Sequence, residues 1–209
     1  MYILPNEQQE KERLRIREFA EEIIAPEAAI LDKEERFSPE LTIKMGEQGL
    51  LGLVAPKEYG GQEKDTLSYI IAVEELARVD SSQAATVVAH NSLGLTPIIN
   101  HGTTEQKEKY LPKLTSGKHL WAFGLTEENA GSDARGTETT AVRDGDQWVI
   151  NGTKRYITNA STSLTLGVTL QVMTKDSNGR SNLTTIFVEN GTPGFESKRM
   201  LGKMMWRAA

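Results

Sequence analysis

Through residue 120, hydrophobic side chains recur at the three- and four-residue spacing that is typical of amphipathic helices. Between residues 16 and 24 charged residues separate the apolar ones, and Pro26 is expected to end or bend this helix. Segment 67–79 is apolar on most faces, which predicts a central helix. Segment 84–99 is rich in small and apolar residues and predicts another buried helix. We therefore expect an all-helical first half.

Capping residues mark two helix starts. Ser38 followed by Pro39 is typical of an N-cap with proline at the first helical position. Thr103 and Gln106 have the spacing of a capping box, which predicts a last helix that runs through Leu114.

After Trp121 the pattern changes to short runs of β-branched and apolar residues between turn signals such as Asp144-Gly145-Asp146. The runs that predict strands are 139–143, 147–150, 155–158, 164–174 and 183–188. Helices followed by strands are typical of an α+β protein. We expect a helical domain over 1–120 and a mostly antiparallel β-barrel or sandwich over 121–209.

Composition narrows the function. Hydrophobic residues at 38% and charged residues at 25% are ordinary for a globular protein, and the net charge of −5 argues against a nucleic-acid partner. The absence of cysteine excludes disulfides and thiolate metal sites, and three scattered histidines lack metal-ligand spacing. No segment has the length and apolarity of a membrane span, and the N-terminus lacks a secretory signal pattern. We expect a bacterial cytoplasmic protein, with the mitochondrial matrix as the alternative.

The richest chemistry lies between residues 121 and 159. Leu125-Thr126-Glu127, followed by Ala130-Gly131-Ser132-Asp133, predicts a strand end and a glycine turn that presents N–H groups and hydroxyls. On an extended strand, Tyr156 and Thr158 would share one face and point a ring and a hydroxyl at one flat ligand. A flavin needs such polar contacts and a dry, flat pocket. Each piece alone is also common turn or strand composition.

Several ordered motifs make the chain resemble the acyl-CoA dehydrogenase family. Segment 102–117 resembles the entry into the family's middle domain, and segments 123–133 and 150–159 resemble its two signatures. Matches to its later β segment are Pro193-Gly194-Phe195, Leu201-Gly202 and Trp206-Arg207. The chain departs from the pattern where it has Glu128 in place of a frequent proline, Asn129 in place of a frequent glycine, and Tyr156 in place of a frequent tryptophan.

The resemblance implies an FAD-dependent oxidoreductase of fatty-acid metabolism that desaturates acyl-CoA thioesters. It assigns to the cofactor Phe123, Leu125, Thr126, Ser132, Tyr156 and Thr158. Thr126 would lie at the pyrimidine edge of the flavin ring, Thr158 near its N5 atom, and Tyr156 against its face. Ser132 would contact the pyrophosphate or the CoA arm, while Asp133 is expected to fix the turn.

The resemblance also places the catalytic base, a glutamate, in a C-terminal helical domain beyond Ala209. We therefore assign no catalytic residue and expect the isolated 209-residue chain to be inactive. Implied partners are acyl-CoA, an electron-transferring flavoprotein and further copies of the chain, as a dimer or tetramer. The alternatives are a sibling flavoenzyme (acyl-CoA oxidase, nitroalkane oxidase or flavin monooxygenase), a non-catalytic binding module, or an unrelated α+β protein.

His90 and the pair Glu74 and Glu75 are further candidates for a functional role. By resemblance, His90 borders the acyl-chain pocket and is a candidate substrate contact, although a packed, hydrogen-bonded histidine is favoured. Glu74 and Glu75 are adjacent carboxylates in an apolar helix, where ion pairing is favoured over a role as a base.

Overall fold

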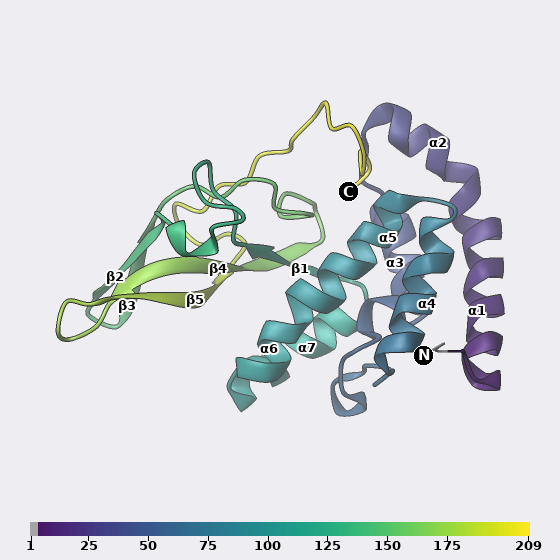
Figure 1. Cartoon of the computed structure of the whole chain (residues 1–209), viewed down its shortest axis with the longest axis horizontal. Coiled ribbons are helices and arrows are strands. Elements are labelled where there is room, and N and C mark those ends of the chain that lie inside the picture. Colours follow the sequence, from purple (N-terminus) through teal and green to yellow (C-terminus); the bar gives the residue numbers. More distant parts are fainter. Residues whose placement is uncertain (1–3) are drawn as a thin grey trace.

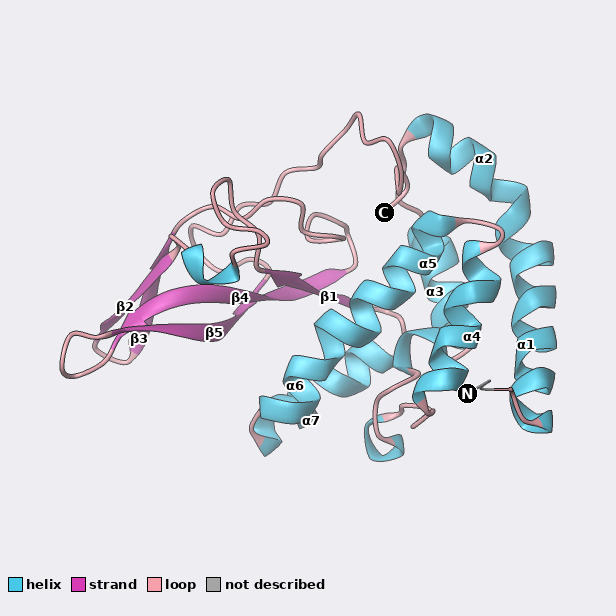
Figure 2. Ribbon diagram, viewed as in Figure 1, coloured by secondary structure: helices cyan, strands magenta, loops and turns pink. Residues whose placement is uncertain are grey.

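The computed structural model describes residues 4–209, with the α-helices gathered in one body and the strands in another (Figures 1 and 2). The expected α+β class is confirmed. Residues 1–3, which belong to the N-terminal segment examined for a signal pattern, lie outside the described range.

Helices α1 and α2 form one bent arm at the edge of the helical body (Figure 1). Helix α1, Glu7–Phe19, passes into a π-helical turn, Ala20–Ile24, and continues as α2, Ala25–Glu34. Pro26 lies in the first turn of α2 and has no N–H to donate to the preceding π-helical turn, in which the Ala20 carbonyl accepts from the Ala25 N–H. The bend expected at this proline is confirmed, and the π-helical turn accommodates it.

The other helices follow in chain order: α3 Pro39–Glu47, α4 Thr66–Ala77, α5 Ser81–Val88, α6 Thr96–His101 and α7 Thr104–Thr115. Both predicted caps are confirmed. The Ser38 hydroxyl accepts a hydrogen bond from the Leu41 N–H at 3.2 Å, and Thr103 and Gln106 form both bonds of a capping box.

The helix predicted over 84–99 is interrupted. Helix α5 leads into a π-helical segment, Ala89–Leu95, and then into α6. Pro97 in the first turn of α6 has no N–H to donate to the preceding turn, so regular α-helical bonding cannot run through this point. Single π-helical turns of this kind are frequent at functional sites.

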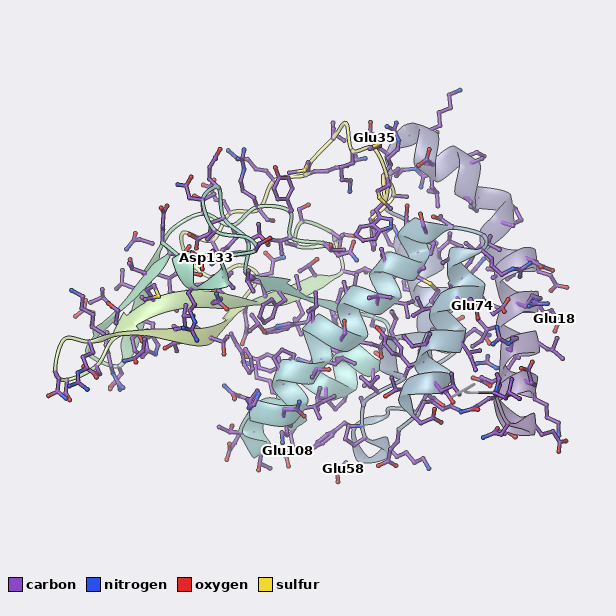
Figure 3. All side chains as sticks on the ribbon, viewed as in Figure 1. Glu18, Glu35, Glu58, Glu74, Glu108 and Asp133 are labelled. Carbon is purple, nitrogen blue, oxygen red and sulfur yellow. The ribbon has the colours of Figure 1, made fainter. Side chains whose placement is uncertain are left out.

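Glu75 is a fully buried carboxylate that joins α4 to α1. Its oxygens lie 3.0 Å from Arg13, 2.9 Å from Arg17 and 3.0 Å from Arg78. Hydrogen bonds from Arg17 above all, and also from Arg13 and Arg78, outweigh burial and lower the pKa of Glu75 to about 2. Glu74, labelled in Figure 3, pairs with Arg13 at 2.6 Å. The expected ion pairing of these two carboxylates is therefore confirmed.

The sheet has five strands among the described residues: β1 Leu120–Gly124, β2 Thr140–Asp144, β3 Gln147–Asn151, β4 Thr165–Lys175 and β5 Ser181–Glu189. Strand β4 is central, because it pairs in parallel with β1 and β2 and antiparallel with β5. Strands β2 and β3 form the predicted hairpin. The sheet is thus mixed and open, where the sequence favoured a mostly antiparallel, closed or two-layered arrangement.

An aromatic cluster joins the sheet to the helices. Trp121 on β1 is buried, with its ring 4.8 Å from that of Tyr110 on α7 and 5.8 Å from that of Phe187 on β5. Its indole N–H donates to the Thr169 hydroxyl at 2.9 Å, so the polar atom of this buried side chain is satisfied. Strand β1 is therefore held by both bodies.

Residues 196–209 leave the sheet and return to α2 without forming a strand (Figure 1). The later β segment expected from the matches at 193–207 is thus not β structure in the part of the chain described here. Glu35, labelled in Figure 3, accepts from the Gly202 N–H at 2.7 Å and pairs with Arg207 at 3.2 Å. The buried Ala208 packs beside α2 and α3.

Candidate functional site

A pocket of about 220 Å³ opens where the π-helical segment, the end of β1 and the loop after β3 meet. Its lining residues are Ala89, Leu93, Phe123, Leu125, Thr126, Tyr156, Ile157 and Thr158. Apolar walls surround two hydroxyls and one phenol. Pockets that enclose a whole drug-sized ligand are typically about 300–1,000 Å³, so this volume suits one ring system and not an entire dinucleotide.

The pocket unites five of the six residues that the sequence assigned to a cofactor, all except Ser132. They come from two segments, one that continues β1 through Thr126 and one that covers 156–158. The sequence analysis did not name Ala89 and Leu93, which form the helical wall, although the resemblance placed the helix around His90 beside the acyl-chain pocket. The signal that points to them is Pro97, since it predicts an irregular turn in the helix that precedes it.

The strand predicted over 155–158 is wrong. These residues form a loop, in which Tyr156 and Asn159 have left-handed backbones with φ of 59° and 60°. A left-handed residue interrupts the extended ladder of a strand, so the predicted shared strand face of Tyr156 and Thr158 does not exist. The loop nevertheless brings both side chains to the pocket.

Tyr156 is strained and exposed. A left-handed backbone is an outlier for a bulky residue, and such strain concentrates at functional sites. Its side chain is 67% exposed although it lines an apolar pocket. The ring is therefore available to a flat ligand instead of being used in the protein core.

A buried ion pair joins the two chain segments that line the pocket. Lys154 Nζ is 2.6 Å from Glu127 Oε1, and it also donates to the Leu125 carbonyl at 2.9 Å. Burial raises the pKa of Glu127, but hydrogen bonds from Lys154 and from Thr139 and Glu138 outweigh it and hold the pKa at about 2. Sequence reasoning gave neither residue this role, because the pair is 27 positions apart.

His90 is packed inside the protein and does not line the pocket. It is 1% exposed, its Nε2 lies 3.2 Å from the Leu114 carbonyl oxygen, and its Nδ1 accepts from the Trp121 N–H at 3.2 Å. Both ring nitrogens are used, which corrects the assignment of His90 as a substrate contact and supports the favoured structural role. Burial lowers the pKa of His90 to about 4, although its carbonyl contacts act in the opposite direction.

No residue of the glycine turn 130–133 lines the pocket. Ser132 is exposed and does not line it, so the structure gives this residue no contact with the ring site. Asp133 accepts a hydrogen bond from the Arg135 N–H at 3.2 Å, which confirms its expected role in fixing the turn (Figure 3).

Other site types were sought among residues 4–209. No helix in this range is both long and apolar enough to cross a membrane. The same residues contain no group of three or more histidine, aspartate or glutamate side chains placed to hold a metal ion.

Known proteins match the chain throughout. Residues 6–118 match the N-terminal domain of acyl-CoA dehydrogenases and residues 122–209 match the middle domain. The short-chain specific acyl-CoA dehydrogenase of Clostridium acetobutylicum is 43% identical over 202 residues, which cover 97% of this chain and 53% of the relative.

Solved structures are also similar to this chain, among them the following two. One belongs to work on the electron transferring flavoprotein of Acidaminococcus fermentans, with a TM-score of 0.91 and 40% identity over 100% of this chain and 54% of that one. The other is a glutaryl-CoA dehydrogenase of Mycobacterium smegmatis in complex with FADH2, with a TM-score of 0.91 and 31% identity over 98% of this chain and 51% of that one.

The chain therefore spans about half the length of the relatives it matches. Both family domains match in order, and the two signature segments supply six of the eight residues that line the pocket. The chain belongs to the acyl-CoA dehydrogenase family.

Proposed function

We propose that the pocket receives the isoalloxazine ring of FAD and that the complete protein desaturates an acyl-CoA thioester. The observation that carries the proposal is the convergence of Thr126, Tyr156 and Thr158 on one apolar pocket. A relative named as a short-chain specific acyl-CoA dehydrogenase and a similar structure that holds FADH2 support it.

The lining residues fit a flavin ring chemically. Two threonine hydroxyls offer hydrogen bonds to a polar ring edge, and the exposed Tyr156 ring offers a stacking face. Leu93, Phe123 and Ile157 supply apolar walls that exclude water. The chemistry that FAD supplies when bound is acceptance of a hydride at its N5 atom.

We assign the side chains distinct tasks. Thr126 holds the pyrimidine edge of the ring, Thr158 contacts the region of N5, and Tyr156 packs on the ring face. Hydrogen bonds to the thioester carbonyl would stabilise the enolate-like transition state that forms when the α-proton leaves.

The eight lining residues include no carboxylate, imidazole or amine that would accept that proton. His90 is closed off by its two hydrogen bonds, and Glu75 is bound to three arginines. We therefore propose that the base is supplied by a group outside this pocket lining and that the 209 residues alone do not turn over acyl-CoA.

The proposed electron acceptor is an electron-transferring flavoprotein, which the similarity to a chain from the A. fermentans work supports. We also propose a homo-oligomer, a dimer or tetramer, that acts in the bacterial cytoplasm; the bacterial origin of the C. acetobutylicum relative supports the compartment.

The test uses the product of the complete gene that encodes these residues. Its visible spectrum is recorded before and after anaerobic addition of short-, medium- and branched-chain acyl-CoAs. Flavin bands that bleach with one of them are the expected result. Flavin that stays oxidised with every acyl-CoA would favour a sibling flavoenzyme, and a protein without flavin would contradict the proposal.

A further inference from the structure

The three side chains proposed to contact the flavin ring, Thr126, Tyr156 and Thr158, lie on two segments outside the regular helices and strands. Thr126 follows the end of β1, and Thr158 lies in the loop after β3. Loops open more readily than helices or strands. A pocket made from two loops therefore needs interactions that hold the loops together, and we call these interactions the fastening.

The Glu127–Lys154 pair lies between these segments. Glu127 follows Thr126 directly, and Lys154 lies two positions before Tyr156. The Lys154 and Glu127 side chains are 7% and 4% exposed, and their charged atoms are 2.6 Å apart. Lys154 additionally donates to the Leu125 carbonyl at 2.9 Å, so one ammonium group holds two successive parts of the first segment.

Backbone groups complete the fastening. The Glu127 carboxylate accepts from the N–H groups of Glu138 at 2.6 Å and Thr139 at 3.1 Å. The Arg155 N–H donates to the Thr126 carbonyl at 2.7 Å, directly between the two pocket segments. Because the carboxylate is buried and every contact is charge-assisted, its removal would leave several donors unpaired.

A second ion pair joins the same two segments and provides an internal comparison. Arg155 lies 2.6 Å from Glu128, but these side chains are 43% and 71% exposed. Solvent and salt screen such a pair, so it contributes little. Adjacent glutamates thus make the same kind of connection, one buried and one at the surface.

We propose that Glu127 and Lys154 are positioning residues that hold the two walls of the pocket together. The identity of the ligand rests on the proposed function, whereas the fastening of the walls is a property of the chain itself. Neither residue lines the pocket, so both act through Thr126, Tyr156 and Thr158.

The experiment compares Glu127→Gln, Lys154→Met and the matched control Glu128→Gln in the full 209-residue chain. Hydrogen exchange of the Arg155 amide reports the fastening, and exchange of the Leu111 amide, buried in α7, reports global opening. A titration with FAD measures the affinity of each variant for this ligand. We expect Glu127→Gln and Lys154→Met to speed exchange at Arg155 and to weaken FAD binding, each by about tenfold or more. Leu111 should change less, and Glu128→Gln should leave both readouts within about threefold.

Three results would overturn the proposal: unchanged exchange at Arg155 in Glu127→Gln, equal acceleration at Arg155 and Leu111, or an equal effect of Glu128→Gln. If the unaltered chain does not bind FAD, the proposed ligand loses support. The exchange measurements then still decide whether the pair fastens the walls.

Discussion

Nδ1 of His90 accepts a hydrogen bond from the backbone N–H of Trp121 at 3.2 Å, which ties the helical body to the first strand of the sheet. Since Nε2 of the same ring faces the Leu114 carbonyl oxygen at 3.2 Å, the neutral ring carries its proton on Nε2. Protonation of Nδ1 would place two N–H groups against each other in a buried site.

This arrangement predicts loss of stability in mild acid. The pKa of His90 is about 4 in the folded protein, below its ordinary value of 6.5. The unfolded state therefore binds more protons between these values, and stability that is present above pH 6.5 is lost as the pH falls. We expect the free energy of unfolding to fall by about 2 kcal/mol between pH 7 and pH 5. Urea denaturation across this range measures it, and His90→Gln should remove most of the dependence. A variant with the same dependence as the parent would show that other groups cause it.

We expect the backbone strain at Tyr156 to lower the stability of the protein, while the tyrosine ring contributes to FAD binding. Tyr156→Gly relieves a left-handed backbone, and we expect it to raise the free energy of unfolding by about 1 kcal/mol. The same change removes the stacking ring and should weaken FAD binding severalfold. Chemical denaturation and FAD titration measure the two effects. Trp206→Gly is the control, because Trp206 is another left-handed aromatic residue and does not line the pocket. It should gain stability without loss of FAD affinity, and a loss as large as that of Tyr156→Gly would refute the stacking role.

Gly94 sets the distance between the π-helical segment and β1. A Cβ atom at this position would lie 2.4 Å from the Trp121 carbonyl oxygen, so the helical wall of the pocket would have to shift. We expect Gly94→Ala to lower the free energy of unfolding by about 1–3 kcal/mol. Gly131→Ala is the matched control, since its Cβ would meet only Thr126 Cγ2, at 3.9 Å. Thermal denaturation of both variants checks this, and equal stability of the two would disprove the close packing.

Local signals in the sequence predicted much of the helical half. The caps at Ser38 and Thr103 and the bend near Pro26 depend on neighbouring residues, and all were confirmed. Strand pairing depends on distant segments, so the parallel contact of β1 with β4 left no signature that sequence reasoning used. The strand predicted over 155–158 failed because Tyr156 adopts a left-handed backbone that its residue type does not favour.

In the candidate site, too, some residues were predicted from the sequence and others were not. Five of its residues came from signature motifs that resemble the family, and the fold brings them to one pocket. The Glu127–Lys154 pair was missed, because nothing local to either residue indicates that the other will be buried against it. Ser132 was assigned to the pyrophosphate or the CoA arm; it is exposed and does not line the ring pocket, and this assignment stays a prediction.

The central claim is that this pocket receives a flavin ring, and a nuclear magnetic resonance titration of the 209-residue chain with FAD tests it most directly. FAD is added up to about 1 mM, so that weak binding is also detected. The account predicts amide shifts concentrated at residues 89–93, 123–126 and 156–158, the segments that line the pocket. Shifts that gather elsewhere on the chain, or no shifts at the highest concentration, would contradict it.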